Sequence, residues 1–101
     1  MTLDDYERAA ARTINAKLDE RERLLDAAAG LAEEAGEVLG IVRKHLYQSR
    51  QLSRETLQEE LGDALWCLTI AARSAGLSLE QVAAANVAKL RARHPSGYSD
   101  R

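Results

Sequence analysis

The sequence is poor in the residues that build strands and disulfides. It has one cysteine, one proline, one tryptophan and no phenylalanine among 101 residues. One cysteine excludes an intramolecular disulfide, and a shortage of aromatic and β-branched residues leaves little material for β-strands. It also lacks a basic-then-apolar start and a long uncharged apolar run, so we expect a cytoplasmic protein with no membrane partner.

The sequence also lacks a strong excess of positive or negative charge. The formal net charge is -2 and the pI is about 5.7, so no broad basic field attracts a nucleic-acid polymer. At 11.1 kDa we expect one domain over residues 1–101, with a core that stays thin unless chains share it. The size therefore predicts a homodimer or a homotetramer.

The residues that the sequence does contain, and their spacing, are typical of α-helices. Thr2 with Asp5 resembles a capping box that opens a helix to about Asn15, and Ser78 with Gln81 resembles another. The pattern predicts further helices over about 21–47, 54–74 and 79–94, and the short polar link 48–53 makes the second and third antiparallel neighbours. We predict an all-α, four-helix bundle-like architecture. The stretch 17–23 reads as a helix end or as a connector.

Two clusters of acids stand at helical spacing on the second and third helices. A step of three residues advances about 300° around the axis, so Glu34 and Glu37 are neighbours on one face, as are Glu60 and Asp63. Glu34 falls inside the apolar sector of its helix, whereas Glu33 points away. Carboxylates buried together raise one another's pKa unless a cation neutralises them. The spacing therefore favours a site for a hard divalent cation such as Mg²⁺, although a solvated acidic face explains the spacing equally well.

Glycines within these helices argue for the site. Gly36, Gly40 and Gly62 each cost about 1 kcal/mol in a helix interior, which suggests that another backbone approaches closely. Cys67 has no partner pattern for nucleophilic catalysis, so we expect a small buried apolar residue there.

Four segments of the sequence resemble those of a known family of hydrolases. They are LAEEAGEV, ELGDALW, NVAKLRARHP and GYS. Glu33-Glu34-Ala35-Gly36-Glu37 and Glu60-Leu61-Gly62-Asp63 resemble the EExxE and ExxD motifs of the MazG-type all-α nucleoside triphosphate pyrophosphohydrolases. The resemblance covers most of the chain from about Leu24 onward.

The resemblance implies hydrolysis of a nucleoside triphosphate between the α and β phosphates, with Mg²⁺ required. We also expect Mn²⁺ as a substitute, and a role either in house-cleaning of unwanted triphosphates or in control of a nucleotide pool. It assigns the metal ligands to Glu34, Glu37, Glu60 and Asp63. Glu33 is the fifth catalytic candidate, which either orients a ligand or a water or caps a surface. Which carboxylate assists the attacking water stays open.

The substrate's phosphates need partners of opposite charge. Asn86, Lys89 and Arg93 form one polar stripe at spacings of three and four, and the resemblance favours phosphate or sugar binding over a role as helix C-terminal cations. Trp66 can stack on a base or pack at a subunit interface, and we favour the interface. Tyr98 either folds the tail over the nucleotide or lies at a frayed end.

Three other readings stay open. A phosphoribosyl-ATP pyrophosphatase shares this chemistry and differs in substrate. A helical interaction module would carry the same acids as surface charge. A ferritin-like di-iron protein is disfavoured because its Glu-x-x-His pairs are absent.

Overall fold

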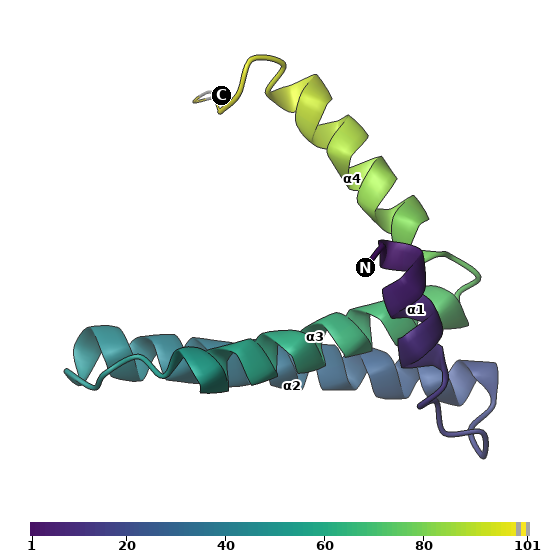
Figure 1. Ribbon diagram of the computed structural model, residues 1–101, viewed down its shortest axis with the longest axis horizontal. Helices are drawn as coiled ribbons and strands as arrows, with labels where there is room; N and C mark the ends of the chain where they lie inside the picture. The colour runs from purple at the N-terminus through teal and green to yellow at the C-terminus, as the bar shows by residue number, and fades with distance from the viewer. Residues whose placement is uncertain (99, 101) are drawn as a thin grey trace.

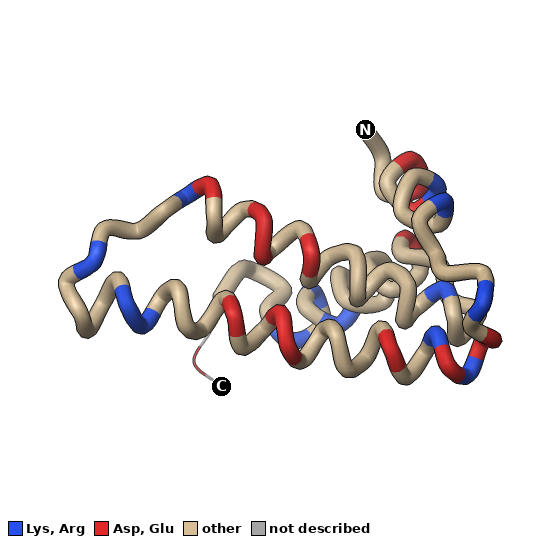
Figure 2. Tube along the Cα trace, turned by 90° about the horizontal axis from the view of Figure 1, so that it is seen from below, with Lys and Arg blue, Asp and Glu red and all other residues tan. Residues whose placement is uncertain are grey.

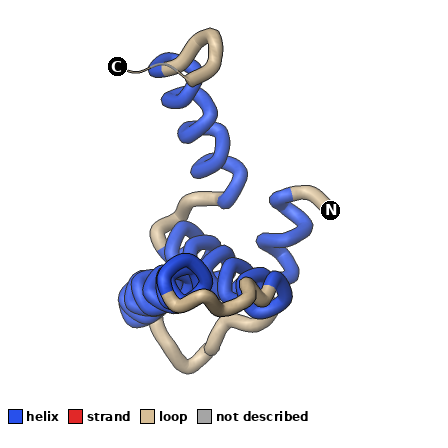
Figure 3. The backbone as a smooth tube through the Cα atoms, turned by 90° about the vertical axis from the view of Figure 1, so that its left-hand side faces the viewer, coloured by secondary structure: helices blue, strands red, loops and turns tan. Residues whose placement is uncertain are grey.

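The computed structural model describes residues 1–98 and 100, and within them every regular element is helical (Figures 1 and 3). The helices are α1 (Leu3–Ala11), α2 (Glu20–Tyr47), α3 (Arg54–Ser74) and α4 (Leu79–Arg93). The all-α prediction is confirmed. In the described part of the chain, no helix combines the length and apolar character needed to cross a membrane. Ser99, which closes the segment GYS of the resemblance, lies outside the described residues.

Both capping boxes expected from the sequence form. The Thr2 hydroxyl accepts from the backbone N–H of Asp5, whose carboxylate accepts from the N–H of Thr2. Ser78 and Gln81 make the same reciprocal pair. Each pair satisfies backbone donors that the first turn of a helix leaves without a partner. The first helix ends at Ala11, four residues before the expected Asn15.

The ambiguous charged stretch contains a third capping box. The Asp19 carboxylate accepts from the N–H of Glu22, and the Glu22 carboxylate accepts from the N–H of Asp19. Helix α2 therefore begins at Glu20, and the residues before it form a connector.

Helices α2 and α3 lie side by side and antiparallel, as predicted, and they form the hairpin on which the other elements rest (Figure 1). The two helices approach closely at Gly30, where an added Cβ atom would lie 2.8 Å from the sulfur of Cys67. Only glycine fits this close approach without a shift of its neighbour. The approach expected at Gly36, Gly40 and Gly62 is wrong within this chain, since nothing lies within 4 Å of a Cβ atom built there.

The core is thin. Its buried members Ala10, Ala27 and Ile70 join α1 to the hairpin. Tyr6, Ile14, Trp66 and Ala71 pack against them and are partly buried. Much of the apolar surface of α2 and α3 stays exposed, including Leu24, Leu39, Leu46, Leu61 and Leu65. Within one chain, these apolar helix faces are therefore not buried.

One buried carboxylate ties three helices together. Glu7 of α1 is buried, and its Oε1 accepts from the backbone N–H of Leu79 at 2.6 Å, at the first turn of α4. Its Oε2 accepts from Nη1 of Arg73 at 3.0 Å, near the end of α3. An anion at a helix N-terminus is stabilised by the unpaired N–H groups and by the helix dipole. Glu7 thereby fixes where α4 begins.

Candidate metal centre

Three acids converge across the middle of the hairpin. One carboxylate oxygen from each of Glu34, Glu60 and Asp63 lies within 4.8 Å of the other two. Glu34 belongs to α2, and the other two belong to α3. Figure 2 shows acidic residues of the two helices at the same level along the hairpin. Antiparallel packing thus unites acids that are 26 and 29 positions apart in the sequence.

The environment of Glu34 disfavours a negative charge. Its Oε2 atom is hidden from solvent and accepts no hydrogen bond from the described residues. A hydrogen bond with the Glu60 carboxyl group, burial, and the charges of Glu60, Asp63 and Glu37 together raise the pKa of Glu34 to about 7. Protonation is one way to relieve this crowding, and a bound cation is the other.

The donor set fits a hard cation. All three side chains offer carboxylate oxygens, which are the ligands that Mg²⁺ and Ca²⁺ prefer. The atom Oε2 of Glu34 has no hydrogen-bond partner among residues 1–98 and 100, although a buried acceptor normally has one. A divalent cation would supply this partner and would offset the repulsion among the three groups.

The other two acids of the first motif lie outside the three-oxygen group. Glu37 is exposed and, together with Glu33, lines an open groove on α2 that also includes Lys44. Its charge still acts on Glu34, so it lies near the cluster. Of the four ligands expected from the resemblance, the structure brings three together.

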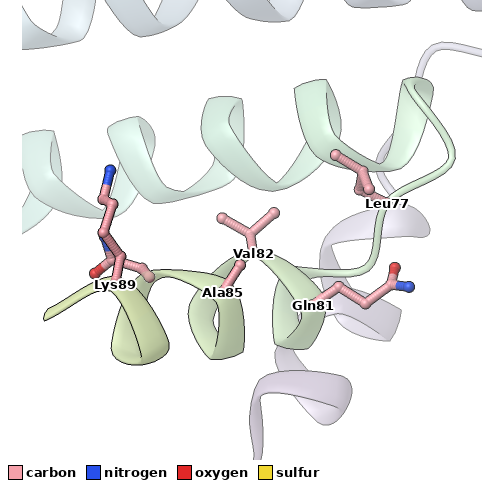
Figure 4. Close-up of a pocket in the computed structure, with 6 residues that line it drawn as sticks. Leu77, Gln81, Val82, Ala85 and Lys89 are labelled. Atoms are coloured by element: carbon pink, nitrogen blue, oxygen red, sulfur yellow. The ribbon is translucent and has the colours of Figure 1, made fainter. Parts of the chain in front are cut away.

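The polar stripe of α4 does not reach these acids within one chain. Helix α4 diverges from the hairpin, and no described residue of it approaches α2 (Figure 1). Asn86 and Lys89 line a groove of about 430 Å³ with Val82, and Figure 4 shows Val82 and Lys89 on the side of α4 that faces α3. Arg93 is exposed. The residues expected to bind the phosphates therefore lie apart from the acids within one chain.

Trp66 and Tyr98, the two aromatic candidates, have partners within the chain. The indole Nε1 of Trp66 donates to the hydroxyl of Thr13 at 2.8 Å, and its ring packs beside the core. Tyr98 stacks on His94 with ring centroids 5.6 Å apart, and its hydroxyl donates to Asp100 at 2.6 Å.

Cys67 is buried, as expected, and lies next to the acids. Burial, followed by the charges of Glu34 and Asp63, raises the pKa of its thiol. A thiol held in its neutral form is a poor nucleophile, which supports a packing role.

Glu7 was missed at the sequence level, although a signal for it existed. It stands four residues after Leu3 and three before Ala10, on the side of α1 that carries apolar residues. An acid at such a position needs a buried partner. This is the same reasoning that singled out Glu34.

Comparison with known families agrees with this geometry. The MazG nucleotide pyrophosphohydrolase domain matches residues 22–98. The chain belongs to this family. The matched range includes all five acids of the two motifs and the polar stripe of α4, whereas α1 precedes it.

Membership in the MazG family supports a nucleotide pyrophosphohydrolase and a nucleotide substrate. Comparison with the curated proteins and with the solved structures found no match. The MazG assignment therefore rests on the family match, together with the acid cluster and the all-helical fold.

Proposed function

We propose that the chain is a Mg²⁺-dependent nucleoside triphosphate pyrophosphohydrolase that cleaves between the α and β phosphates. The observation that carries this proposal is the convergence of Glu34, Glu60 and Asp63, whose oxygens lie within 4.8 Å of one another. The MazG match supports the reaction class. A triphosphate is strongly anionic, so an acidic site serves it only with a bridging cation.

The three convergent acids would hold the cation, with Glu37 as the fourth ligand. Glu37 lies one turn from Glu34, and its exposed side chain is free to turn towards the cluster. Mg²⁺, when bound, supplies charge neutralisation at the phosphates and acidifies a bound water. Mn²⁺ has similar oxygen preferences and would substitute.

The chain's own groups would then perform three tasks in the proposed reaction. A carboxylate oxygen not engaged in ligation accepts a proton from the attacking water, and Glu33 orients that water. The water oxygen bonds to the α phosphorus while the bond from that phosphorus to the oxygen bridging the α and β phosphates breaks. The products are a nucleoside monophosphate and pyrophosphate. Asn86, Lys89 and Arg93 bind the phosphates or the sugar.

The proposal also includes the location, the role and the assembly of the enzyme. We infer a cytoplasmic house-cleaning enzyme that acts on small nucleotides, as a homodimer or homotetramer. The net charge of -2 supports a small substrate over a nucleic-acid polymer, because polymer binding draws on a basic surface.

The test is a panel of nucleoside triphosphates, with phosphoribosyl-ATP included, assayed with Mg²⁺ for both pyrophosphate and orthophosphate. We expect pyrophosphate and a monophosphate from at least one triphosphate. Glu60→Gln should abolish turnover, whereas Glu59→Gln, which changes the exposed neighbour, should keep it. Orthophosphate as the initial product would contradict the proposed bond cleavage.

A second measurement separates the enzyme from a helical interaction module. A cation that binds only the folded chain must raise its melting temperature. We expect Mg²⁺ to raise the melting temperature of the wild type and to leave that of Glu60→Gln nearly unchanged. No shift in the wild type would favour the module.

A further inference from the structure

Tyr6 brings a phenol from α1 to the side of α3 that carries the acids. Helix α1 lies across the end of the hairpin at which α3 finishes (Figure 1). The ring of Tyr6 is partly buried and packs against the core of Ala10, Ala27 and Ile70. The MazG match begins at residue 22, so it gives this tyrosine no role.

The position of Asp63 on α3 relates the phenol to the acids. Asp63, Cys67 and Ile70 fall within about 60° of one another around the axis of α3, at 100° per residue. Burial, then the charge of Asp63 and then that of Cys67, raise the pKa of Tyr6. The effect of a charge falls with distance, and both charges precede Ile70 in α3. The hydroxyl of Tyr6 therefore lies on the side of Ile70 that faces the acid cluster.

The hydroxyl and the carboxylate both lack a partner. Among residues 1–98 and 100, the Tyr6 hydroxyl donates no hydrogen bond and the Asp63 side chain accepts none. The donors of the next turn of α3 do not serve Asp63, since Nε1 of Trp66 donates to Thr13 and the thiol of Cys67 is a weak donor. A carboxylate that binds a metal ion is normally hydrogen-bonded as well. Tyr6 carries the donor that Asp63 needs.

We propose that Tyr6 is a positioning residue of the metal centre, whose hydroxyl donates to the Asp63 oxygen that is not offered to the cation and so holds this carboxylate in place. The inference rests on the proposed function and deepens it, because it gives α1 a part in the metal site. It predicts that the hydroxyl of Tyr6 matters for the affinity of the cation. The ring of Tyr6, in contrast, matters for the stability of the fold.

Asp63 needs such a contact more than Glu34 does. Oε2 of Glu34 is hidden from solvent between the helices, whereas the Asp63 side chain is exposed and free to turn between rotamers. An exposed side chain loses rotamer freedom when it is fixed on a cation. A hydrogen bond from a phenol anchored in the core reduces this loss, because the carboxylate is already oriented when the cation arrives.

The first test is the binding of Mn²⁺ without nucleotide, followed by electron paramagnetic resonance of the free ion. Tyr6→Phe keeps the ring that packs on the core and removes only the hydroxyl. We expect it to bind Mn²⁺ about tenfold more weakly than the wild type. Tyr47→Phe is the matched control, because Tyr47 is 81% exposed, and it should bind as the wild type does. Equal affinities of Tyr6→Phe and the wild type would overturn the proposal.

A double-mutant cycle tests whether Tyr6 acts through Asp63. In chains with Asp63→Ala, Tyr6→Phe should cost little further Mn²⁺ affinity, because the carboxylate that the hydroxyl holds is already gone. In chains with Glu37→Ala, which changes an acid of the other helix, Tyr6→Phe should keep its cost of about tenfold. The same cost in both backgrounds would show that Tyr6 does not act through Asp63, and would overturn the proposal.

Turnover and thermal stability separate positioning from packing and from substrate contact. Tyr6→Phe should need more Mg²⁺ for half-maximal turnover, while kcat and the nucleotide KM at saturating Mg²⁺ stay near those of the wild type. Its Tm without metal should also stay near that of the wild type, because the hydroxyl has no partner among the described residues. A raised nucleotide KM at saturating Mg²⁺ would indicate contact with the substrate and would overturn the proposal, as would a lowered Tm with unchanged Mn²⁺ affinity.

The binding measurements distinguish this inference from the proposed enzyme. If the wild type bound Mn²⁺ with the expected dependence on Tyr6 but hydrolysed no triphosphate, the enzyme would be refuted and the role of Tyr6 supported. If the wild type hydrolysed triphosphates and Tyr6→Phe bound Mn²⁺ unchanged, the role of Tyr6 would be refuted and the enzyme would stand. A wild type that bound no Mn²⁺ would refute both.

Discussion

Removal of the buried carboxylate at position 7 should loosen α4. Glu7→Ala deletes the acceptor of the 2.6 Å bond from the backbone N–H of Leu79 and the partner of Arg73. The N–H of Leu79 is buried at the start of α4, where water does not easily replace a lost acceptor. The three elements α1, α3 and α4 then lose their common anchor.

The magnitude follows from the exposure of each partner. A bond from a buried N–H to a charged acceptor contributes about 1.5–3 kcal/mol. The Arg73 side chain is 47% exposed, so its ion pair adds only about 0.5 kcal/mol after solvent screening. We expect Glu7→Ala to lower the free energy of unfolding by about 2–3.5 kcal/mol. This loss corresponds to about 8–28 °C in Tm for a domain of this size. Glu7→Gln keeps an acceptor for Leu79 and should lose about 1 kcal/mol.

The assay is denaturant unfolding followed by circular dichroism, at one fixed protein concentration because self-association adds to apparent stability. The control is Glu59→Ala, at an exposed position, where surface changes stay within about 0.5 kcal/mol. If Glu7→Ala matched this control, or if the Gln and Ala variants lost the same amount, the anchoring argument would be refuted.

Three further outcomes follow from the hairpin. Without metal, the free energy of unfolding should fall as pH rises from about 4.5 to about 7, because the pKa of Glu34 is about 7 in the fold and 4.5 is its ordinary value. Unfolding measured over a pH series should show this slope. Mg²⁺ should weaken the slope, and Glu34→Gln should abolish it. Gly30→Ala should lower Tm, because the new Cβ would lie 2.8 Å from the facing cysteine sulfur, whereas Gly62→Ala, with open space, should gain about 1 kcal/mol. Trp66→Phe should lose about 1 kcal/mol with its bond to Thr13, measured by denaturant unfolding; a loss equal to that of a surface substitution would contradict this role.

Local signals predicted the helices well. Capping boxes at Thr2 and Ser78 depend only on residues three positions apart, and both form. The box at Asp19 escaped notice because charged residues surround it, although the same local rule applies. The acid cluster was also predictable, since Glu34 occupies an apolar position of α2 and antiparallel neighbours bring their middles together.

Contacts between distant segments were not predictable. The bond from Leu79 to Glu7 joins residues 72 positions apart, and the bond from Trp66 to Thr13 joins residues 53 apart. No periodicity within one helix reports such a pair. The direction of α4, and with it the distance of Lys89 from the acids, depends on these contacts. The residues of the polar stripe could thus be predicted, but their position could not.

The apolar periodicity of α2 and α3 predicted which residues are to be buried, but it did not predict what buries them. Leu24, Leu46 and Leu61 follow the helical period as core residues do, yet within one chain they stay 40% to 61% exposed. Periodicity records that a helix face is to be buried, and it does not say which chain covers it. The core contacts run instead through Ala27 and the small residues that face α3. A hairpin joined through small residues therefore leaves its larger leucines exposed within one chain, although their spacing is that of a buried helix face.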